Sequence, residues 1–288
     1  MWIFSKLGNF ANRKDKDIDC PSTPYIKLIM ETLGIGLLIP MMGIVLGSSL
    51  VFFTQKEMTG LLQKTLLGFA AGVMVSASFW SLLLPSMEMN EDAGSWSVLP
   101  TAGGFLVGMG FLLLLDMLTP HLHLNANQPE GPQAHLSRTT MLMLAVTLHH
   151  IPEGMAIGVV LAGALQGDAD ISLTSALIVS LGMAIQNIPE GAIVSVPMHA
   201  DGHTRTRSFL LGCLSGLAQP LGAVIVLLLA SLFVPLLPWL LAFAAGAMIY
   251  VVIEELIPDA SSGQHTNLST IGFTLGFVMM MVLDVVLG

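Results

Sequence analysis

The sequence predicts an all-α integral membrane protein with eight transmembrane helices. Of its 288 residues 54% are hydrophobic and only 10% are charged, whereas about a quarter of the residues in a soluble domain are charged. The mean hydropathy is +0.80. Eight apolar runs approach the roughly 20 residues that a helix needs to cross the hydrocarbon core, and short polar segments separate them. These three observations exclude a water-soluble globule.

The N-terminal segment, residues 1–32, is distinct from the apolar runs. Trp2, Ile3, Leu7 and Phe10 fall at helical spacing, which is compatible with a short helix on the membrane surface. No long apolar region followed by a small-residue cleavage site is present, so a removed signal peptide is not expected. Residues 33–288 form one domain, with spans predicted at 33–54, 62–85, 98–119, 139–164, 171–197, 207–234, 236–257 and 269–287.

The loop charges predict the orientation. Basic residues of short loops favour the cytoplasm, and here they occupy alternate connections, at Lys56, Lys64, Arg138, Arg205 and Arg207. The other connections hold carboxylates instead, at Glu88, Glu91, Asp92, Asp168 and Asp170. We therefore expect a multi-pass protein of the cell membrane with both termini outside the cytoplasm. The net charge of -9 suggests no nucleic-acid partner.

Six spans carry a Gly-x-x-x-Gly pair, a pattern that lets helix backbones approach closely in lipid. These pairs predict a compact bundle and say nothing about a substrate. They are Gly43 and Gly47, Gly68 and Gly72, Gly104 and Gly108, Gly154 and Gly158, Gly212 and Gly216, and Gly272 and Gly276.

One motif occurs twice. Span four contains His-His-Ile-Pro-Glu-Gly at 149–154, and span five contains Gln-Asn-Ile-Pro-Glu-Gly at 186–191. Proline removes a backbone hydrogen bond and kinks a helix, so Pro152 and Pro189 are expected to open space between the two helices. Paired, interrupted helices of this kind indicate a transporter's binding site near the bilayer midplane.

The repeated motif also supplies ligands. Residues four apart share a helix face, so His149 lies over Glu153 and Gln186 over Glu190. An ionised side chain at mid-membrane costs at least about 2.5 kcal/mol, and two facing carboxylates repel. A divalent cation removes both penalties, and imidazole with carboxylate oxygen suits zinc, iron, manganese or cadmium better than calcium. We therefore predict a metal site between kinked helices four and five.

With these motifs the chain resembles the ZIP family of divalent-metal transporters, and its GufA-like bacterial branch in particular, from span one to Gly288. The resemblance implies zinc transport toward the cytoplasm, with cadmium, iron or manganese as further ions, across a bacterial inner membrane. It implies no enzyme activity and no cofactor beyond the transported metal. Spans one, four, five and six would carry the metal and spans two, three, seven and eight would form a scaffold, with elevator-like sliding between them. The family is often dimeric, so a homodimer is implied.

The resemblance also implies the site residues. His149, Glu153, Gln186 and Glu190 match the principal metal site. A second, weaker site would share the two glutamates and add His150, Asn187 and Gln219. Bacterial relatives commonly have Glu where Gln219 stands and some have Asp at Asn187, so the second site loses negative charge here.

Further residues match the transport pathway of the family. Met74 and Ala77 correspond to an apolar plug of the outer path, and Glu88 and Asp284 to entrance carboxylates. Glu254 and Glu255 fall on the exit side. Asp116, His121 and His123 resemble a cytoplasmic segment that collects metal.

Two other function classes compete with metal transport. An intramembrane zinc metalloprotease usually needs H-E-x-x-H, but no second histidine lies four residues after His149, and the duplicate helix adds a carboxylate. A proton-coupled carrier of an organic anion would need an intramembrane Arg or Lys, and the spans contain neither away from their ends. Without a Walker motif, ATP-driven pumping is not expected.

Overall fold

The computed structural model describes residues 23–54, 59–90, 94, 96, 98–120, 132, 138–166, 172–232, 236–263 and 266–287. In these residues all regular elements are helices, and no strand occurs. The surface helix predicted from Trp2, Ile3, Leu7 and Phe10 lies outside them.

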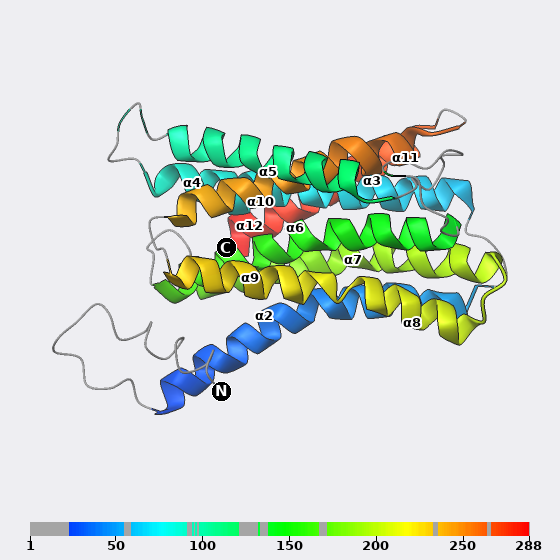
Figure 1. Ribbon diagram of the computed structural model, residues 1–288, viewed down its shortest axis with the longest axis horizontal. Coiled ribbons are helices and arrows are strands. Elements are labelled where there is room, and N and C mark those ends of the chain that lie inside the picture. Colours follow the sequence, from blue (N-terminus) through cyan, green and yellow to red (C-terminus); the bar gives the residue numbers. More distant parts are fainter. Residues whose placement is uncertain are drawn as a thin grey trace.

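Eight helical spans in the described residues are long and apolar enough to cross a membrane, as predicted. They run side by side, and α2 begins at the same end of the bundle at which α12 ends (Figure 1). The spans consist of α2 (Thr23–Ser49) with η1 (Leu50–Phe52), α3 (Gly60–Ala77) with η2 (Ser78–Leu83) and α4 (Leu84–Glu88), α5 (Val98–Leu118), α6 (Arg138–Gln166), α7 (Leu173–Ala200), α8 (Arg205–Ser215) with α9 (Ala218–Leu232), α10 (Leu237–Val251) with η5 (Val252–Leu256) and α11 (Ile257–Ser261), and α12 (Leu268–Leu287).

The sixth span differs from the prediction of one apolar run over 207–234. It is broken between α8 and α9 at Gly216 and Leu217. Pro220 lacks the N–H that would continue the helical ladder to the Gly216 carbonyl, and Gln219 N donates to that carbonyl instead, at 3.2 Å. The break leaves carbonyl groups at the end of α8 available to other partners.

The second and seventh spans contain π-helical turns, η2 and η5. Each turn precedes a proline, Pro85 or Pro258, whose missing N–H removes one bond of the α-helical ladder. Both spans also contain Phe-Ala-Ala-Gly-x-Met, at 69–74 and 243–248, so they form a second internal repeat. By contrast, α6 and α7 continue as single helices through Pro152 and Pro189.

The glycine pairs form the tight helix contacts that the sequence predicted. A Cβ added at Gly43 would overlap the Ala184 carbonyl of α7, and one at Gly154 would overlap the Gln219 carbonyl of α9. In the same way α3 packs against α12 and α5 against α10. The bundle therefore contains four closely packed helix pairs, α2 with α7, α6 with α9, α3 with α12, and α5 with α10.

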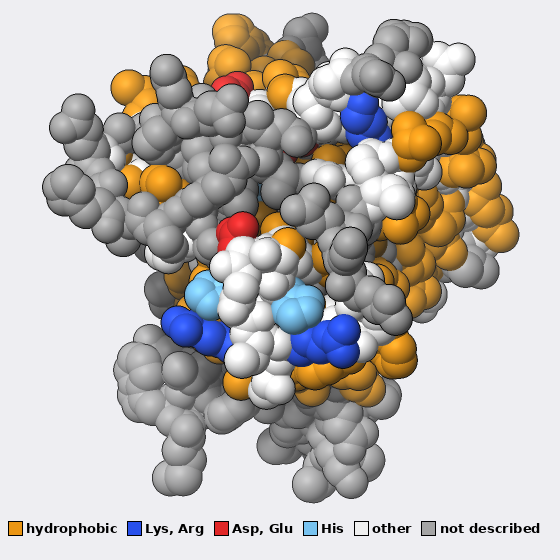
Figure 2. Space-filling model, turned by 90° about the vertical axis from the view of Figure 1, so that its right-hand side faces the viewer, with side chains coloured by type: hydrophobic (Ala, Val, Ile, Leu, Met, Phe, Trp, Pro, Cys, Tyr) orange, Lys and Arg blue, Asp and Glu red, His pale blue; other side chains and the backbone are white. Residues whose placement is uncertain are grey.

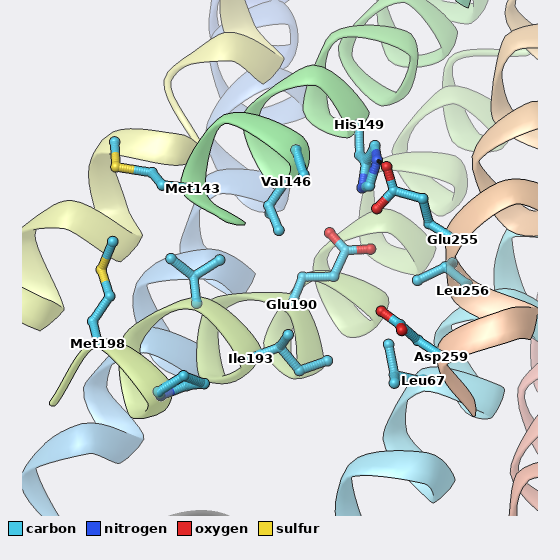
Figure 3. A pocket seen from close by; sticks show the side chains of 13 residues that line it. Leu67, Met143, Val146, His149, Glu190, Ile193, Met198, Glu255, Leu256 and Asp259 are labelled. Carbon is cyan, nitrogen blue, oxygen red and sulfur yellow. Dashed lines mark hydrogen bonds and ion pairs between the residues drawn. The ribbon is translucent and has the colours of Figure 1, made fainter. Parts of the chain in front are cut away.

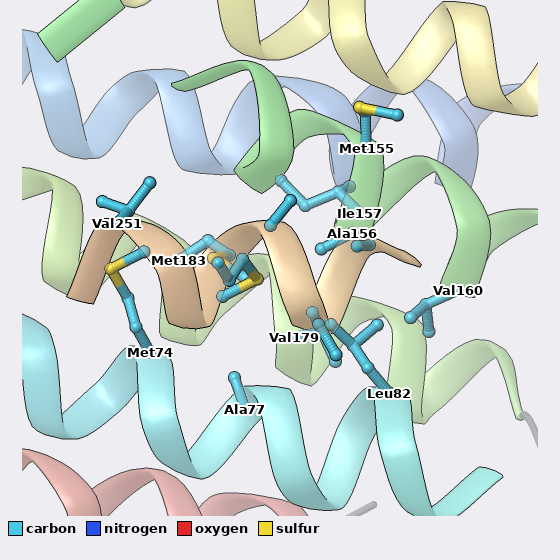
Figure 4. Packing of buried hydrophobic residues seen from close by; sticks show 14 of the residues in the cluster. Met74, Ala77, Leu82, Met155, Ala156, Ile157, Val160, Val179, Met183 and Val251 are labelled. Carbon is cyan, nitrogen blue, oxygen red and sulfur yellow. The ribbon is translucent and has the colours of Figure 1, made fainter. Parts of the chain in front are cut away.

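Larger apolar side chains fill the boundary between these pairs. Met74, Ala77 and Leu82 from the second span meet residues of α6 and α7 (Figure 4). All of these side chains are buried. The partners labelled in Figure 4 on α6 and α7 include Ala156, Ile157, Val160, Val179 and Met183.

The outer surface of the bundle is apolar, and one end is basic. Leu106, Met117 and Leu275 are each more than 60% exposed, as expected for side chains that face lipid. Basic side chains and histidines gather on the end viewed in Figure 2. The elements that begin or end there supply Lys64, His199, His203, Arg205 and Arg207. The chain is thus a multi-pass membrane protein.

Candidate metal centre

Three side chains of α6 and α7 converge inside the bundle. One ligand atom each of His150, Glu153 and Glu190 lies within 4.8 Å of the other two, and all three residues are buried. His150 and Glu153 are three residues apart, so they share a face of α6, while Glu190 comes from the neighbouring α7. One nitrogen and two carboxylates thus face a common point, which is a metal-ligand set.

The hydrogen bond of His150 prepares it as a ligand. Its Nδ1 lies 3.1 Å from the Ser215 carbonyl oxygen at the end of α8. A carbonyl only accepts, so Nδ1 carries a proton, and in the neutral imidazole Nε2 then presents its lone pair. Nε2 lies 3.3 Å from Glu190 Oε2. Two acceptors facing each other repel, and a cation between them would convert this contact into an attraction.

Further polar atoms around the centre have no hydrogen-bond partner. They are Glu153 Oε1, Asn187 Oδ1 and both amide atoms of Gln186, all of them buried. A buried polar atom without a partner costs about 1–3 kcal/mol. A divalent cation would satisfy the oxygens among these atoms, so the residues fit a metal of the zinc type.

A chain of amide hydrogen bonds supports the centre from behind. Asn187 Nδ2 donates to the Pro40 carbonyl oxygen at 3.0 Å and to Gln219 Oε1 at 2.9 Å. Gln219 Nε2 in turn donates to Glu153 Oε2 at 2.9 Å. This amide chain joins α2, α7, α9 and α6.

His149 lies apart from the cluster. Its Nε2 contacts Glu255 Oε1, which η5 carries. Both residues border a cavity that also reaches Glu190 and Asp259 (Figure 3). Because Met143, Pro197 and Met198 line the same cavity, it extends from the centre toward the basic end of the bundle.

A separate recess lies on the opposite side of the centre. It is lined by the two predicted entrance carboxylates, Glu88 and Asp284, and the Asp284 carboxylate accepts from Ser81 Oγ at 2.9 Å. Val160 and Val179 line this recess and also belong to the apolar cluster of Met74 and Ala77. The cluster therefore lies between the recess and the metal centre.

The remaining predicted residues lie elsewhere. Asp116 accepts a hydrogen bond from Tyr250 Oη at 3.0 Å, and Glu254 is exposed in η5. His121 and His123 lie outside the described residues. Asp259 in the cavity was missed from the sequence, although its spacing of four from Glu255 indicates a shared helix face. The supporting carbonyls of Pro40 and Ser215 carry no such signal, because every residue has a carbonyl.

Fold and site together define a class of protein, a multi-pass helical membrane protein with a buried cluster of His and Glu side chains that could hold a divalent cation. The family model described as ZIP zinc transporter matches residues 121–284. The chain is 34% identical to zinc transporter ZIP11 of Homo sapiens, over 84% of this chain and 93% of that protein. It is 40% identical to zinc transporter ZIPB of Bordetella bronchiseptica, over 78% of this chain and 72% of that protein. With zinc transporter GufA of Myxococcus xanthus it shares 35% identity, over 77% and 85% of the two chains. The chain belongs to the ZIP zinc transporter family.

Proposed function

We propose that the protein carries divalent transition-metal ions, zinc first, through the membrane toward the basic end of the bundle. The observation that carries this proposal is the buried cluster of His150, Glu153 and Glu190 at the head of a cavity. A transport site must bind the ion away from water and still release it. Cadmium, iron and manganese accept the same ligands. The comparisons do not support the protease alternative.

The ligand set that we propose is His150 Nε2, Glu153 Oε1 and Glu190 Oε2. Gln186 or Asn187 would add an amide oxygen, since these oxygens are buried without partners. Zinc most often takes about four ligands, so this set is sufficient. In place of the principal-site role predicted for His149, we propose that it receives the ion on the way out, together with Glu255. Asp259 would extend that path along the cavity.

Transport requires that the centre reach both sides in turn, and the packing supports a division into two bodies. We propose that α2 and α6–α9 move together, because the amide chain and the glycine contacts join these helices. The spans α3–α4, α5, α10–α11 and α12 would form the scaffold. In the present conformation the apolar cluster with Met74 and Ala77 would close the path from the recess of Glu88 and Asp284.

The basic end would face the cytoplasm by the positive-inside rule, so both termini would be extracytoplasmic. In a bacterium this membrane would be the inner membrane. We also propose that the protein forms a homodimer. Metal would be collected on the cytoplasmic side by Asp116, His121 and His123. No resident cofactor is needed, because the metal is the substrate.

Metal flux in proteoliposomes tests the proposed function. Vesicles containing the purified protein should accumulate zinc, seen by an enclosed zinc-sensitive dye, and cadmium should compete. The matched control is the Glu153→Ala, Glu190→Ala double variant reconstituted to the same density. Equal zinc entry in the two preparations would refute transport through this centre. Orientation is read from protease access to the loops at the basic end.

A further inference from the structure

We propose that Gln219 is a positioning residue which, as a neutral hydrogen-bond donor, limits the metal centre to one divalent ion. The inference rests on the proposed function and deepens it, because it concerns how many ions the same centre holds. It replaces the sequence-based expectation that Gln219 is itself a metal ligand. Three observations carry it: the direction of the amide chain, the division of the Glu153 oxygens, and the charge of the centre.

The two ends of the amide chain determine its direction. At one end the Pro40 carbonyl only accepts, so the group of Asn187 that contacts it must be the NH₂. That NH₂ also contacts Gln219, so the atom it meets there must be the Gln219 oxygen. At the other end the Glu153 carboxylate accepts from the Gln219 NH₂. Reversing either amide would place donor against donor or acceptor against acceptor.

The direction of this chain divides the two oxygens of Glu153. Oε2 accepts the N–H of Gln219, while Oε1 is buried without a hydrogen-bond partner and is the oxygen left free to bind a cation together with His150 and Glu190. Gln219 therefore presents hydrogens rather than a lone pair to the centre, and its oxygen is already used by Asn187. A cation beside Glu153 Oε2 would meet the positive end of this amide dipole.

The charges of the centre lead to the same count. With a metal bound, Glu153 and Glu190 contribute two negative charges, while His150 as a ligating imidazole and the amides of Gln186, Asn187 and Gln219 contribute none. One divalent ion makes this group neutral, whereas a second would leave two positive charges in a buried site, where uncompensated charge is costly. On the cavity side, Glu255 is engaged with His149, and Asp259 lies farther along the cavity wall.

Metal counting on the purified full-length protein tests this inference. The protein is equilibrated with zinc, and bound zinc is counted against the Glu153→Ala, Glu190→Ala variant, so that ions held elsewhere are subtracted. We expect a difference of one ion for the unmutated protein and two ions for Gln219→Glu, which adds a ligand and a negative charge. The matched control is Gln219→Leu, similar in size but uncharged, for which we expect one.

X-ray absorption of the zinc-loaded protein provides a second measurement that does not depend on a variant. Two ions that share carboxylates lie about 3.5–4 Å apart, and this metal–metal distance should be absent from the unmutated protein and present in Gln219→Glu.

Two ions in the unmutated centre would overturn the inference, and so would one ion in folded Gln219→Glu or two in Gln219→Leu. If Gln219→Glu does not fold, the count and the metal–metal distance in the unmutated protein still decide. A difference of zero ions in the unmutated protein would instead overturn the proposed metal centre itself.

Discussion

At the residue scale, two adjacent histidines have different surroundings. Successive residues of a helix point about 100° apart, so His150 faces Glu190 and Ser215 within the cluster, while His149 faces Glu255 of η5. The motif that contains both histidines does not distinguish these surroundings, whereas the contacts of each ring do.

The first prediction compares alanine substitutions of these histidines. His150→Ala should weaken zinc binding at the centre by at least about 10–100-fold, the cost of losing even an outer-shell partner of a metal ligand. His149→Ala should change the affinity only a few-fold and alter the rate of zinc release instead. Equilibrium zinc binding and release rates measure the two effects. The reverse order of affinities would restore His149 as the principal ligand.

The second prediction concerns acidity. Imidazole and carboxylate ligands bind a metal only when they are deprotonated, so protons compete with zinc. Zinc affinity should therefore decrease as the pH falls and be fully present in neutral or mildly alkaline solution. Titrations in buffers from pH 8 to about pH 5, a range that includes the ordinary titration of histidine, measure this. An affinity independent of pH would contradict ligation by His150, Glu153 and Glu190.

At the element scale, close helix contacts place the ligands in register. Gly154 lies one residue after Glu153 and allows the backbone of α9 to approach α6 at Gln219. The hydrogen bond between Gln219 and Glu153 therefore depends on a glycine that contacts no metal. The break between α8 and α9 likewise makes the Ser215 carbonyl available to His150. The way these helices pack therefore determines which hydrogen bonds Glu153 and His150 make.

The third prediction compares two glycines. Gly154→Ala should destabilise the protein by about 1–3 kcal/mol, the usual cost of overpacking, and weaken zinc binding because α9 must move away. Gly110→Ala is the matched control, since nothing lies within 4 Å of a Cβ added at Gly110. It should be neutral or stabilise by up to about 1 kcal/mol through its helix propensity. Thermal unfolding in detergent compares them, and equal melting temperatures would contradict the proposed contact.

At the scale of the whole molecule, the cavity leads from the centre toward the basic end, and in the described residues the apolar cluster separates it from the recess of Glu88 and Asp284. The alternating access that we propose would require movement of α2 and α6–α9 along the apolar boundary. Residues that meet there would then separate in each cycle. Gly182 of α7 and Met280 of α12 form one such contact.

The fourth prediction uses this contact. With Cys20 and Cys213 replaced, a disulfide between Gly182→Cys and Met280→Cys should stop zinc flux, and a reducing agent should restore it. Each single cysteine variant, treated with the same oxidant, serves as the control and should keep its flux. Full transport by the cross-linked protein would exclude relative movement at this boundary.

The sequence alone determined the class of fold and indicated the two helix segments that form the candidate centre. Apolar runs long enough to cross a bilayer, basic residues in alternate loops, glycine pairs and a duplicated Pro-Glu-Gly motif are local features. Each of these features helps to predict the fold, because the membrane interior contains no water and penalises exposed polar groups. The eight spans, the glycine contacts and the convergence of Glu153 with Glu190 could all be predicted in this way. The interruptions before Pro85, Pro220 and Pro258 were within reach of the same reasoning.

Only the tertiary structure decided which atoms face one another. The sequence could not separate His149 from His150, because their directions depend on how α6 is rotated against α7, α8 and η5. Nor could it show that Gln219 donates to Glu153, because the direction of an amide depends on partners as distant in the chain as Pro40. Membrane burial acts on every residue of a span and leaves a sequence pattern, whereas hydrogen-bond direction depends on single contacts between helices and leaves none.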